Sequence, residues 1–330
     1  MSLLPLTLAC AAYDRTLPLY DGRVLPEGID LNVLLLRYED TFWRMLRHQE
    51  FDVSEMSLSS YLISKEKGPD FVALPIFLSR VFRHSSIYIN TKSGINEVKD
   101  LKGKSIGVPE YQMTAALWIR GIFQHEYGVC PEEMKWFSGG LDEPGRVEKL
   151  DLNLPKGVSL TLIPENQTLN NMLISGEIVA VVTARAPSSF NEKHPNVDRL
   201  FKNYKKEEIS YYQKTKIYPP MHCVAIRRDV YEQNRWIAQS LFKAFLEAKE
   251  FCSISYMFDG HLRYALPFLH AAVEEHKKIF GEDDPWAYGV EENRHTIETL
   301  IKYSCEQGLI PRTYTLEELF AEETFATSRN

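Results

Sequence analysis

The chain has 330 residues, of which 44% are hydrophobic and 25% are charged. That balance is typical of a globular protein, and the length favours two compact units, because a single core rarely grows beyond about 250 to 300 residues. The formal net charge of -7 argues against a nucleic-acid partner, whose phosphates would be repelled. We therefore expect a two-unit protein that does not bind nucleic acid.

The cysteines and the N-terminal segment bear on location. Five widely spaced cysteines without a Cys-x-x-Cys pair predict neither a disulfide framework nor a thiolate zinc site. The apolar start lacks a cationic region and contains Pro5, so we interpret 6–12 as a buried strand rather than a signal peptide. No apolar run of about 18 residues predicts a transmembrane helix. These features predict a cytoplasmic protein with no membrane partner.

The first ninety residues alternate strand-like and helix-like patterns. Short apolar runs predict strands at 6–12, 29–36, 51–56, 71–75 and 86–90. Between the second and third of these runs, Phe42, Met45 and Leu46 recur at helical spacing, which predicts a helix over 38–49. This alternation is typical of an α/β unit.

A second α/β pattern begins near residue 100. It predicts strands at 105–108, 134–137, 158–163 and 178–183 and helices at 114–127 and 168–175. A strand-like run follows His222, and from Asp229 onward the spacing is nearly all helical.

The order of these elements predicts a two-lobed α/β fold with a hinge and a mostly helical C-terminal segment. Lobe 1 would comprise 1–90 plus 222–330, and lobe 2 would comprise 91–221, with the substrate cleft between the lobes. Ligands of open α/β sheets bind beyond the carboxyl ends of strands. The loops expected at the cleft are 13–22, 55–60, 109–114 and 184–188.

Segments at and near these loops resemble the 4,5-dihydroxyphthalate decarboxylase family. They are ACAAYDRTLPLYDGRV, DVSEMSLSSYL, FLSRVFRHSSIYIN, LKGKSIGVPEYQMTAALWIRG, GGLDEPGRVEK and YPPMHCVAIR. DLKGKSIGVPE alone looks like many solute-binding proteins, whereas RVFRHSSIY together with EYQMTAALWIRG is much more specific. The resemblance covers essentially the whole chain.

The resemblance implies a type II periplasmic-binding-protein-like fold and a carboxy-lyase activity. The implied reaction releases carbon dioxide from 4,5-dihydroxyphthalate, or a close dihydroxylated aromatic diacid, to give protocatechuate during phthalate degradation. The implied partner is thus a small aromatic dicarboxylate. Fold alone does not establish activity, so the residue roles below are argued from chemistry and loop position.

Losing carbon dioxide from an arene requires a place for the electrons of the breaking bond. A hydroxyl para to the leaving carboxylate supplies one if the ring carbon is first protonated, so we expect no cofactor. No His-x-x-x-His or His-Glu-x-x-His spacing predicts a metal site. The protein must then supply cations for a dianion, a base for the hydroxyls and an acid for the ring carbon.

Arginine suits the dianion because its planar fork pairs two donors with a carboxylate. The candidates in or beside predicted loops are Arg15, Arg80, Arg83 and Arg185. Arg120, within a predicted helix, and Arg146, in a long loop, are weaker candidates. For each, a surface position or a structural ion pair is the alternative.

Histidine suits the acid because both its protonation states are accessible at neutral pH. His84 ends the arginine cluster, and His222 lies beside the predicted hinge. Glu55 follows a strand and is the candidate base, with Ser57 close behind it as a substrate contact. A structural role is the alternative for each histidine, and a helix-capping role is the alternative for Glu55.

Tyr111, Gln112 and Thr114 occupy a predicted strand-to-helix loop, where side-chain donors and helix amides can bind an anion. The alternative is an ordinary helix cap by Thr114. Tyr13 could stack on an aromatic substrate, although aromatic residues at such places are more often core.

Two other functions remain open at this point. One is a solute-binding protein that delivers an aromatic carboxylate to an ABC-type transporter, which would share the fold and the arginines. The other is a different enzyme on this fold, such as those of the futalosine route to menaquinone, for which RVFRHSSIYIN is a weaker match. The sequence leaves open the substituted phthalate used, the carboxylate that leaves and whether the chain forms a homo-oligomer.

Overall fold

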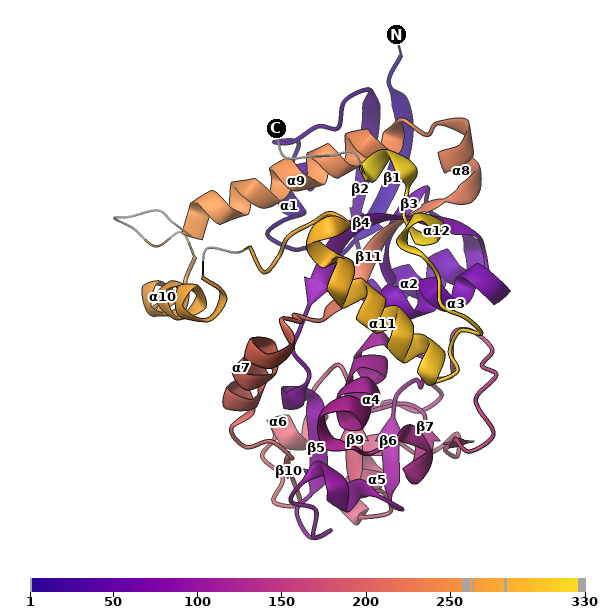
Figure 1. Cartoon of the computed structure of the whole chain (residues 1–330), viewed down its shortest axis with the longest axis vertical. Coiled ribbons are helices and arrows are strands. Elements are labelled where there is room, and N and C mark those ends of the chain that lie inside the picture. The colour runs from indigo at the N-terminus through magenta and orange to yellow at the C-terminus, as the bar shows by residue number, and fades with distance from the viewer. Residues whose placement is uncertain (1, 257–261, 263, 282–283, 326–330) are drawn as a thin grey trace. The chain divides into compact units, whose positions relative to one another are not determined.

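The computed structural model describes residues 2–256, 262, 264–281 and 284–325. The chain divides into two compact units. Unit 1 comprises Met1–Arg80, Pro220–Ile297 and Tyr314–Asn330, and unit 2 comprises Val81–Pro219 and Glu298–Thr313. Figure 1 labels most of the helices and strands of both.

Unit 1 is built on a five-stranded sheet of order β2-β1-β3-β11-β4. The strands are β1 (Leu4–Cys10), β2 (Ile29–Leu35), β3 (Val53–Ser57), β4 (Phe71–Arg80) and β11 (Pro220–Arg227). β1 runs parallel to β2 and β3, whereas β11 runs antiparallel to β3 and β4. Every residue of β3 is buried, although the strand reads VSEMS. A carboxylate at its centre must therefore find partners inside the unit.

Helices cover the unit 1 sheet. Leu241, Phe245 and Ala248 of α9 (Ile237–Tyr256) are spaced for one helix face and join the core cluster that contains Leu74 and Val224 of the sheet. The other helices of unit 1 are α1 (Leu17–Tyr20), α2 (Tyr38–His48), α3 (Leu58–Lys67), α8 (Arg228–Gln233), α10 (Leu269–Phe280) and α12 (Leu316–Leu319). None of the helices in the described ranges is long and apolar enough to cross a membrane.

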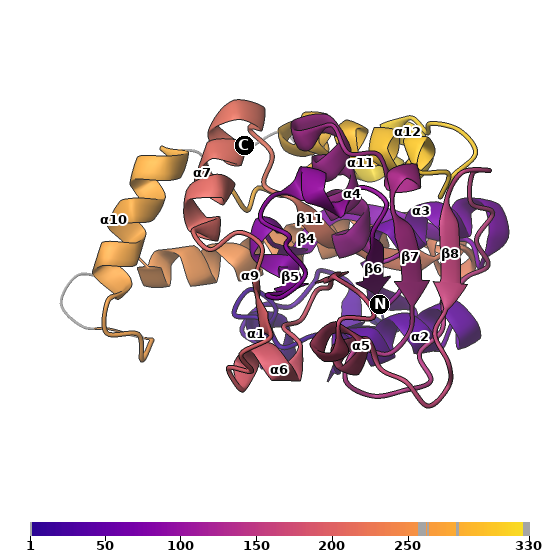
Figure 2. The same ribbon diagram turned by 90° about the horizontal axis from the view of Figure 1, so that it is seen from below.

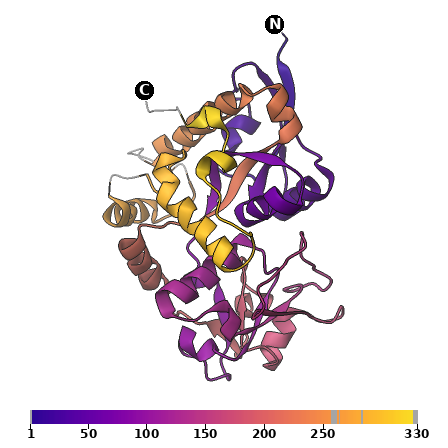
Figure 3. The ribbon, with the colours of Figure 1, turned by 45° about the vertical axis from the view of Figure 1, so that its right-hand side comes forward.

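The C-terminal segment, yellow in Figure 3, completes unit 1 after α12. Phe320 forms a parallel bridge with Ala73 of β4, and the N–H of Ala321 donates to the Ala73 carbonyl. Phe320 and Ala321 thus protect the edge of the sheet at β4.

Unit 2 is built on a six-stranded sheet of order β10-β5-β9-β6-β7-β8. The strands are β5 (Ile87–Asn90), β6 (Ser105–Val108), β7 (Lys135–Ser138), β8 (Ser159–Leu162), β9 (Ala180–Val182) and β10 (Val197–Arg199). β6 to β9 run parallel, and Figure 2 shows β6, β7 and β8 side by side. The helices are α4 (Thr114–Tyr127), α5 (Leu169–Ser175), α6 (Ser188–Asn191) and α7 (Tyr204–Thr215).

A late segment also belongs to unit 2, because the division falls within α11 (Arg294–Glu306). A Cβ atom added at Gly121 of α4 would lie 2.0 Å from the ring of Tyr303, so only glycine allows this approach. Arg120 Nε donates to Gln307 Oε1 at 2.8 Å. These contacts tie Glu298–Thr313 to α4.

The sequence predicted most elements to within a few residues, and 105–108 and 114–127 match β6 and α4. The strand predicted at 71–75 continues to Arg80. The lobe limits differ from the expected ones, because β5 pairs with β9 and β10 of unit 2 and because 298–313 also joins unit 2. The hinge and the cleft stay predictions.

Candidate active site

The strand order of unit 1 brings three chain segments to one edge of its sheet. β1 and β3 are parallel neighbours, so Tyr13 and Arg15, which follow β1, lie at the same edge as the end of β3. β11 begins at this edge because it runs the other way. In its register with β3, His222 faces Ser57 and Val224 faces Glu55. His222 and Glu55 are therefore diagonal neighbours on one face of the sheet.

Glu55 and His222 are joined directly. His222 Nδ1 lies 2.6 Å from Oε1 of Glu55. The same carboxylate accepts a hydrogen bond from the Tyr13 hydroxyl at 2.7 Å and another from the Ala11 N–H at 2.9 Å. The Glu55 side chain is 0% exposed and that of His222 is 12% exposed. The carboxylate is thus held by three donors, while the imidazole lies nearer to solvent.

The electrostatics of this group follow from its contacts. Burial alone would raise the pKa of Glu55, but the hydrogen bond and charge of His222, with the Tyr13 and Ala11 donors, hold that pKa below its ordinary value. Burial and the neighbouring Glu55 charge raise the pKa of Tyr13, so its hydroxyl remains a donor. Glu55 is the anion of the cluster, and it fixes the proton of His222 on Nδ1 when the ring is neutral.

Aromatic residues hold the His222 ring in place. Its centroid lies 4.8 Å from that of Phe42, edge-on, and 5.4 Å from that of Tyr38, both on α2. With Nδ1 bound to Glu55, proton exchange with a ligand would use Nε2. A buried carboxylate behind a positioned imidazole can serve as an acid–base pair.

Arg15 adjoins this cluster. Its guanidinium carbon lies 4.2 Å from the centroid of the Tyr13 ring and 4.6 Å from that of Trp286. Nε donates to the Leu78 carbonyl at 2.9 Å, and Nη1 pairs with Asp14 at the same distance. Tyr13 therefore touches both the arginine and the carboxylate, which places a cation beside the joined Glu55 and His222 side chains.

Two further predicted residues lie in unit 1. Ser57 is buried at the end of β3, with its hydroxyl 3.3 Å from that of Ser59. Arg80 Nη2 donates to the Ala287 carbonyl at 3.1 Å and to Oδ1 of Asn293. Both partners of Arg80 lie far away in sequence, so these hydrogen bonds join distant segments of unit 1.

The remaining basic candidates lie in unit 2. Arg83 is buried, with Nη1 3.4 Å from the Ser86 hydroxyl, whereas Arg185 is exposed. His84 is buried against the rings of Phe201 and Tyr211. This burial lowers the pKa of His84 to about 4, so the ring carries no stored proton at neutral pH. Desolvation thus disfavours the charged form that an acid role for His84 would require, and that role stays a prediction.

The loop between β6 and α4 holds Tyr111, Gln112 and Thr114. All three are buried, and Thr114 is the first helical residue rather than the cap, which is Met113. The N–H groups of Tyr111 and Gln112 donate to the carboxylate of Glu148, the second at 3.3 Å. A carboxyl group therefore does lie on this loop, and it comes from the chain itself.

Sequence reasoning missed several of these residues. Tyr13 was considered only for stacking, although its position after β1 and opposite β3 could have suggested a contact with Glu55. No comparable signal existed for Trp286 or Glu148, because the partners of these side chains include backbone groups distant in sequence.

A metal centre finds no support in the described part of the chain, where no three His, Cys, Asp or Glu side chains are grouped so as to hold an ion. The five cysteines are free.

Comparisons with known proteins identify the same family that the sequence segments resemble. No family model matches the chain. The chain is 40% identical over 321 residues to the 4,5-dihydroxyphthalate decarboxylase of Comamonas testosteroni, covering 97% of each protein. It is 44% identical over 204 residues to the protein of that name from Pseudomonas putida, covering 62% of this chain and 79% of the relative.

Solved structures identify the fold. The periplasmic aliphatic sulphonate binding protein SsuA from Escherichia coli matches with a TM-score of 0.53 at 12% identity, covering 98% of this chain and 99% of that protein. The predicted two-lobed, type II periplasmic-binding-protein-like fold is thereby confirmed. The length and level of the sequence identity place the chain in the 4,5-dihydroxyphthalate decarboxylase family.

Proposed function

We propose that the chain is a carboxy-lyase that converts 4,5-dihydroxyphthalate to protocatechuate and carbon dioxide in phthalate degradation. The observation that carries this proposal is the 40% identity over 97% of the chain to a protein of that name. The joined Glu55 and His222 side chains supply an acid–base pair suited to the chemistry.

In the proposed reaction, protonated His222 delivers a proton from Nε2 to the ring carbon that carries the leaving carboxylate. The hydroxyl para to that carbon gives up its proton to solvent and becomes a carbonyl, so the ring is temporarily a dienone. The carbon–carbon bond then breaks and carbon dioxide leaves, while its bonding electrons restore the aromatic ring and leave the para oxygen as a phenolate. The phenolate takes a proton back from solvent, so the net reaction consumes one proton for each carboxylate lost.

Glu55 has a supporting part in this scheme. Its carboxylate binds Nδ1 of His222, which leaves Nε2 as the ring nitrogen that can exchange a proton with the substrate. Tyr13 holds the carboxylate through its hydroxyl. Of the two histidines that the sequence offered as the acid, we assign the role to His222, because His84 is buried and uncharged at neutral pH.

We assign binding of the dianion to those predicted residues whose contacts in the structure are compatible with it. Arg15 lies beside the acid–base pair, and the loop of Tyr111 and Gln112 holds a carboxylate through its amides. Arg83, Arg185, Ser57 and Thr114 stay candidates for further contacts. Arg80 is the weakest, since its Nη2 serves Ala287 and Asn293.

The scheme needs no cofactor, because the para hydroxyl is itself the electron sink. We also propose a cytoplasmic location, which agrees with the five free cysteines.

The test of the proposed activity is incubation of the purified chain with 4,5-dihydroxyphthalate, following carbon dioxide and protocatechuate together. Stoichiometric formation of both supports the proposal, and no product at any protein concentration overturns it. Turnover lost on dialysis against a chelator and restored by a divalent ion would overturn the cofactor-free scheme alone.

A solute-binding role is the second candidate, and the fold shared with a periplasmic binding protein is the observation that favours it. A binding protein would retain the dihydroxyphthalate unchanged. The same incubation therefore separates the two functions.

A further inference from the structure

The connection between β7 and β8 carries a short charged segment onto the β6–α4 loop. This connection spans 139–158 and contains no helix or strand. Connections longer than about 12 to 15 residues without such structure are uncommon and usually functional. Arg146 and Lys149 both pair with Glu110, with Nε of Arg146 2.7 Å from its Oε1. Glu148, between them, reaches the amides of Tyr111 and Gln112.

Two successive N–H groups that converge on one carboxylate are an anion-binding arrangement of the backbone. Here they precede the helix α4, whose N-cap is Met113. The carboxylate of Glu148 takes the position that any carboxylate ligand of these amides would take.

A buried cation stands behind the same peptide group. Nη2 of Arg120 donates to the Tyr111 carbonyl at 2.7 Å, and this carbonyl and the Gln112 N–H belong to one peptide unit. Arg120 is 0% exposed, and within the described residues no carboxylate forms an ion pair with it and its Nη1 has no hydrogen-bond partner. Hydrogen bonds in such a chain polarise one another. The guanidinium therefore strengthens the Gln112 N–H as a donor to an anion.

Glu148 is a poorly stabilised occupant of this position. Burial raises the pKa of Glu148 to about 7, although the two amides act in the opposite direction, and the nearby Glu110 adds to the rise. Its ionised form is thus less favourable here than in water. A ligand carboxylate that arrives with other contacts can compete with it.

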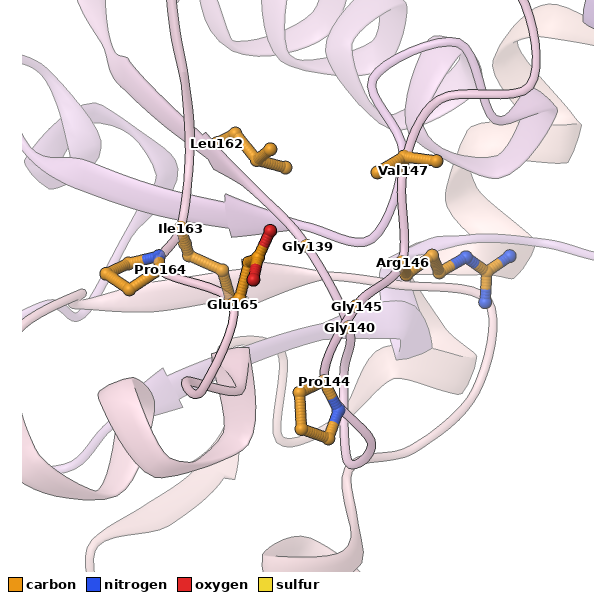
Figure 4. Close-up of a pocket in the computed structure, with 10 residues that line it drawn as sticks. All are labelled: Gly139, Gly140, Pro144, Gly145, Arg146, Val147, Leu162, Ile163, Pro164 and Glu165. Atoms are coloured by element: carbon orange, nitrogen blue, oxygen red, sulfur yellow. The ribbon is translucent and has the colours of Figure 1, made fainter.

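Space for a ligand adjoins the segment. A pocket of about 300 Å³ is lined by Gly139, Gly140 and 144–147 on one side and by 162–165 on the other (Figure 4). It lies at the carboxyl ends of β7 and β8, where parallel sheets bind ligands. Arg146 and Val147, which line it, immediately precede Glu148. A Cβ at Gly140 would lie 1.6 Å from the Glu143 carbonyl oxygen, so the turn that shapes this wall requires glycine.

We propose that the amides of Tyr111 and Gln112 form a carboxylate-exchange site, which Glu148 and one carboxylate of an aromatic diacid occupy in turn. The identity of the diacid rests on the proposed function, whereas the exchange itself does not. Arg120 is a positioning residue of this site, since it acts through the peptide and not on the ligand. Glu148 sets the affinity, because each ligand must displace it.

The experiment measures binding of phthalate, which has both carboxylates but lacks the hydroxyls that the decarboxylation scheme requires. Calorimetric titration compares the unmodified chain with Glu148→Gln. We expect the variant to bind phthalate about tenfold more tightly, because its neutral amide competes less well for the two N–H groups. Glu148→Asp keeps the charge beside Lys149 but shortens the reach, and it should also bind more tightly. Glu143→Gln, an exposed change in the same connection, is the matched control and should leave the affinity unchanged.

Unchanged or weaker binding in a folded Glu148→Asp or Glu148→Gln chain overturns the exchange site, as does the absence of phthalate binding in all chains. Carbon dioxide release from 4,5-dihydroxyphthalate is measured on the same samples. Tighter phthalate binding without any release would keep the exchange site and overturn the decarboxylase. Carbon dioxide release together with an unaltered phthalate affinity in the Glu148 variants would keep the decarboxylase and overturn the exchange site.

Discussion

His222 and Glu55 meet across neighbouring antiparallel strands, with Nδ1 of the imidazole 2.6 Å from Oε1 of the carboxylate. Because Glu55 also accepts the Tyr13 hydroxyl, the three side chains form one hydrogen-bonded row. The imidazole is the more exposed of the two joined groups and the carboxylate is buried. Replacing each of the three residues should therefore have a different effect on activity.

Tyr13→Phe removes one donor from the Glu55 carboxylate and keeps the ring that contacts Arg15. The ionised carboxylate loses stabilisation, so the pKa of Glu55 should rise, and the acid limb of the pH–rate profile should move to higher pH. We expect kcat to fall by about tenfold, which corresponds to about 1.4 kcal/mol. The measurement is kcat for carbon dioxide release across pH.

The control is Tyr20→Phe, an exposed tyrosine for which no change is expected. A Tyr13→Phe profile that only loses height, with its acid limb unmoved, would contradict a role through Glu55.

The common location of Glu55 and His222 could be predicted from sequence, because strand ends gather at one edge of a sheet. Glu55 lies in a short strand, and His222 lies at the start of another, so topology brought both to this edge. Which side chains touch could not be predicted, because the diagonal contact depends on the β3–β11 register. The desolvation of His84 by Phe201 and Tyr211 was equally invisible, since both rings come from distant segments.

Contacts between segments distant in sequence also explain why the domain boundaries differ from the predicted ones. The helical pattern predicted from Asp229 onward is confirmed in the residues that the structure describes there, but periodicity does not say which core a helix joins. The contact between Gly121 and Tyr303 decides that the end of α11 belongs to unit 2. Gly121 inside a predicted helix indicated a close contact, but the sequence did not show that its neighbour is Tyr303.

A substitution at Arg80 tests whether this arginine has a structural role or binds the substrate. Lysine cannot reproduce the geometry by which Nη2 serves both the Ala287 carbonyl and Asn293. We expect Arg80→Lys to lower the free energy of unfolding by about 1 to 3 kcal/mol while the KM for dihydroxyphthalate stays within about twofold. Denaturant titration and steady-state kinetics measure the two effects.

Arg294→Lys changes an exposed arginine that pairs with Glu291 and should alter the unfolding free energy by less than about 0.5 kcal/mol. A strong rise in KM for Arg80→Lys without loss of stability would return Arg80 to the substrate site.

His84 predicts a pH dependence of stability. Its pKa falls on folding from 6.5 to about 4 because of burial, so the unfolded chain binds a proton that the folded chain does not bind in this range. The stability contribution is complete above pH 6.5 and is lost as pH falls toward 4. The loss is on the order of 3 kcal/mol, at about 1.4 kcal/mol per pH unit.

His84→Phe replaces the ring without a titrating group, and the fall in thermal stability between pH 6.5 and 4 should be shallower than in the unmodified chain. His48→Gln, at an exposed position, should leave the slope unchanged. Equal slopes for the unmodified chain and His84→Phe would mean that His84 stays protonated in the fold, which would restore it as a candidate acid.

The final prediction tests whether His222 and Glu55 act as one unit. His222→Gln removes the proposed acid and should lower kcat by about a hundredfold or more, while KM changes little. Glu55→Gln leaves the imidazole without its anionic partner, so kcat should also fall strongly. Because each change disables the same proton transfer, the double variant should be hardly slower than His222→Gln alone. Steady-state kinetics on the three variants completes the cycle, with circular dichroism to verify folding and with His48→Gln and Glu50→Gln as exposed controls. If the two losses instead multiply, the residues act independently and the hydrogen bond between them is structural. If His222→Gln turns over normally while His84→Gln does not, the acid is His84 and the proposed direction of proton delivery is wrong.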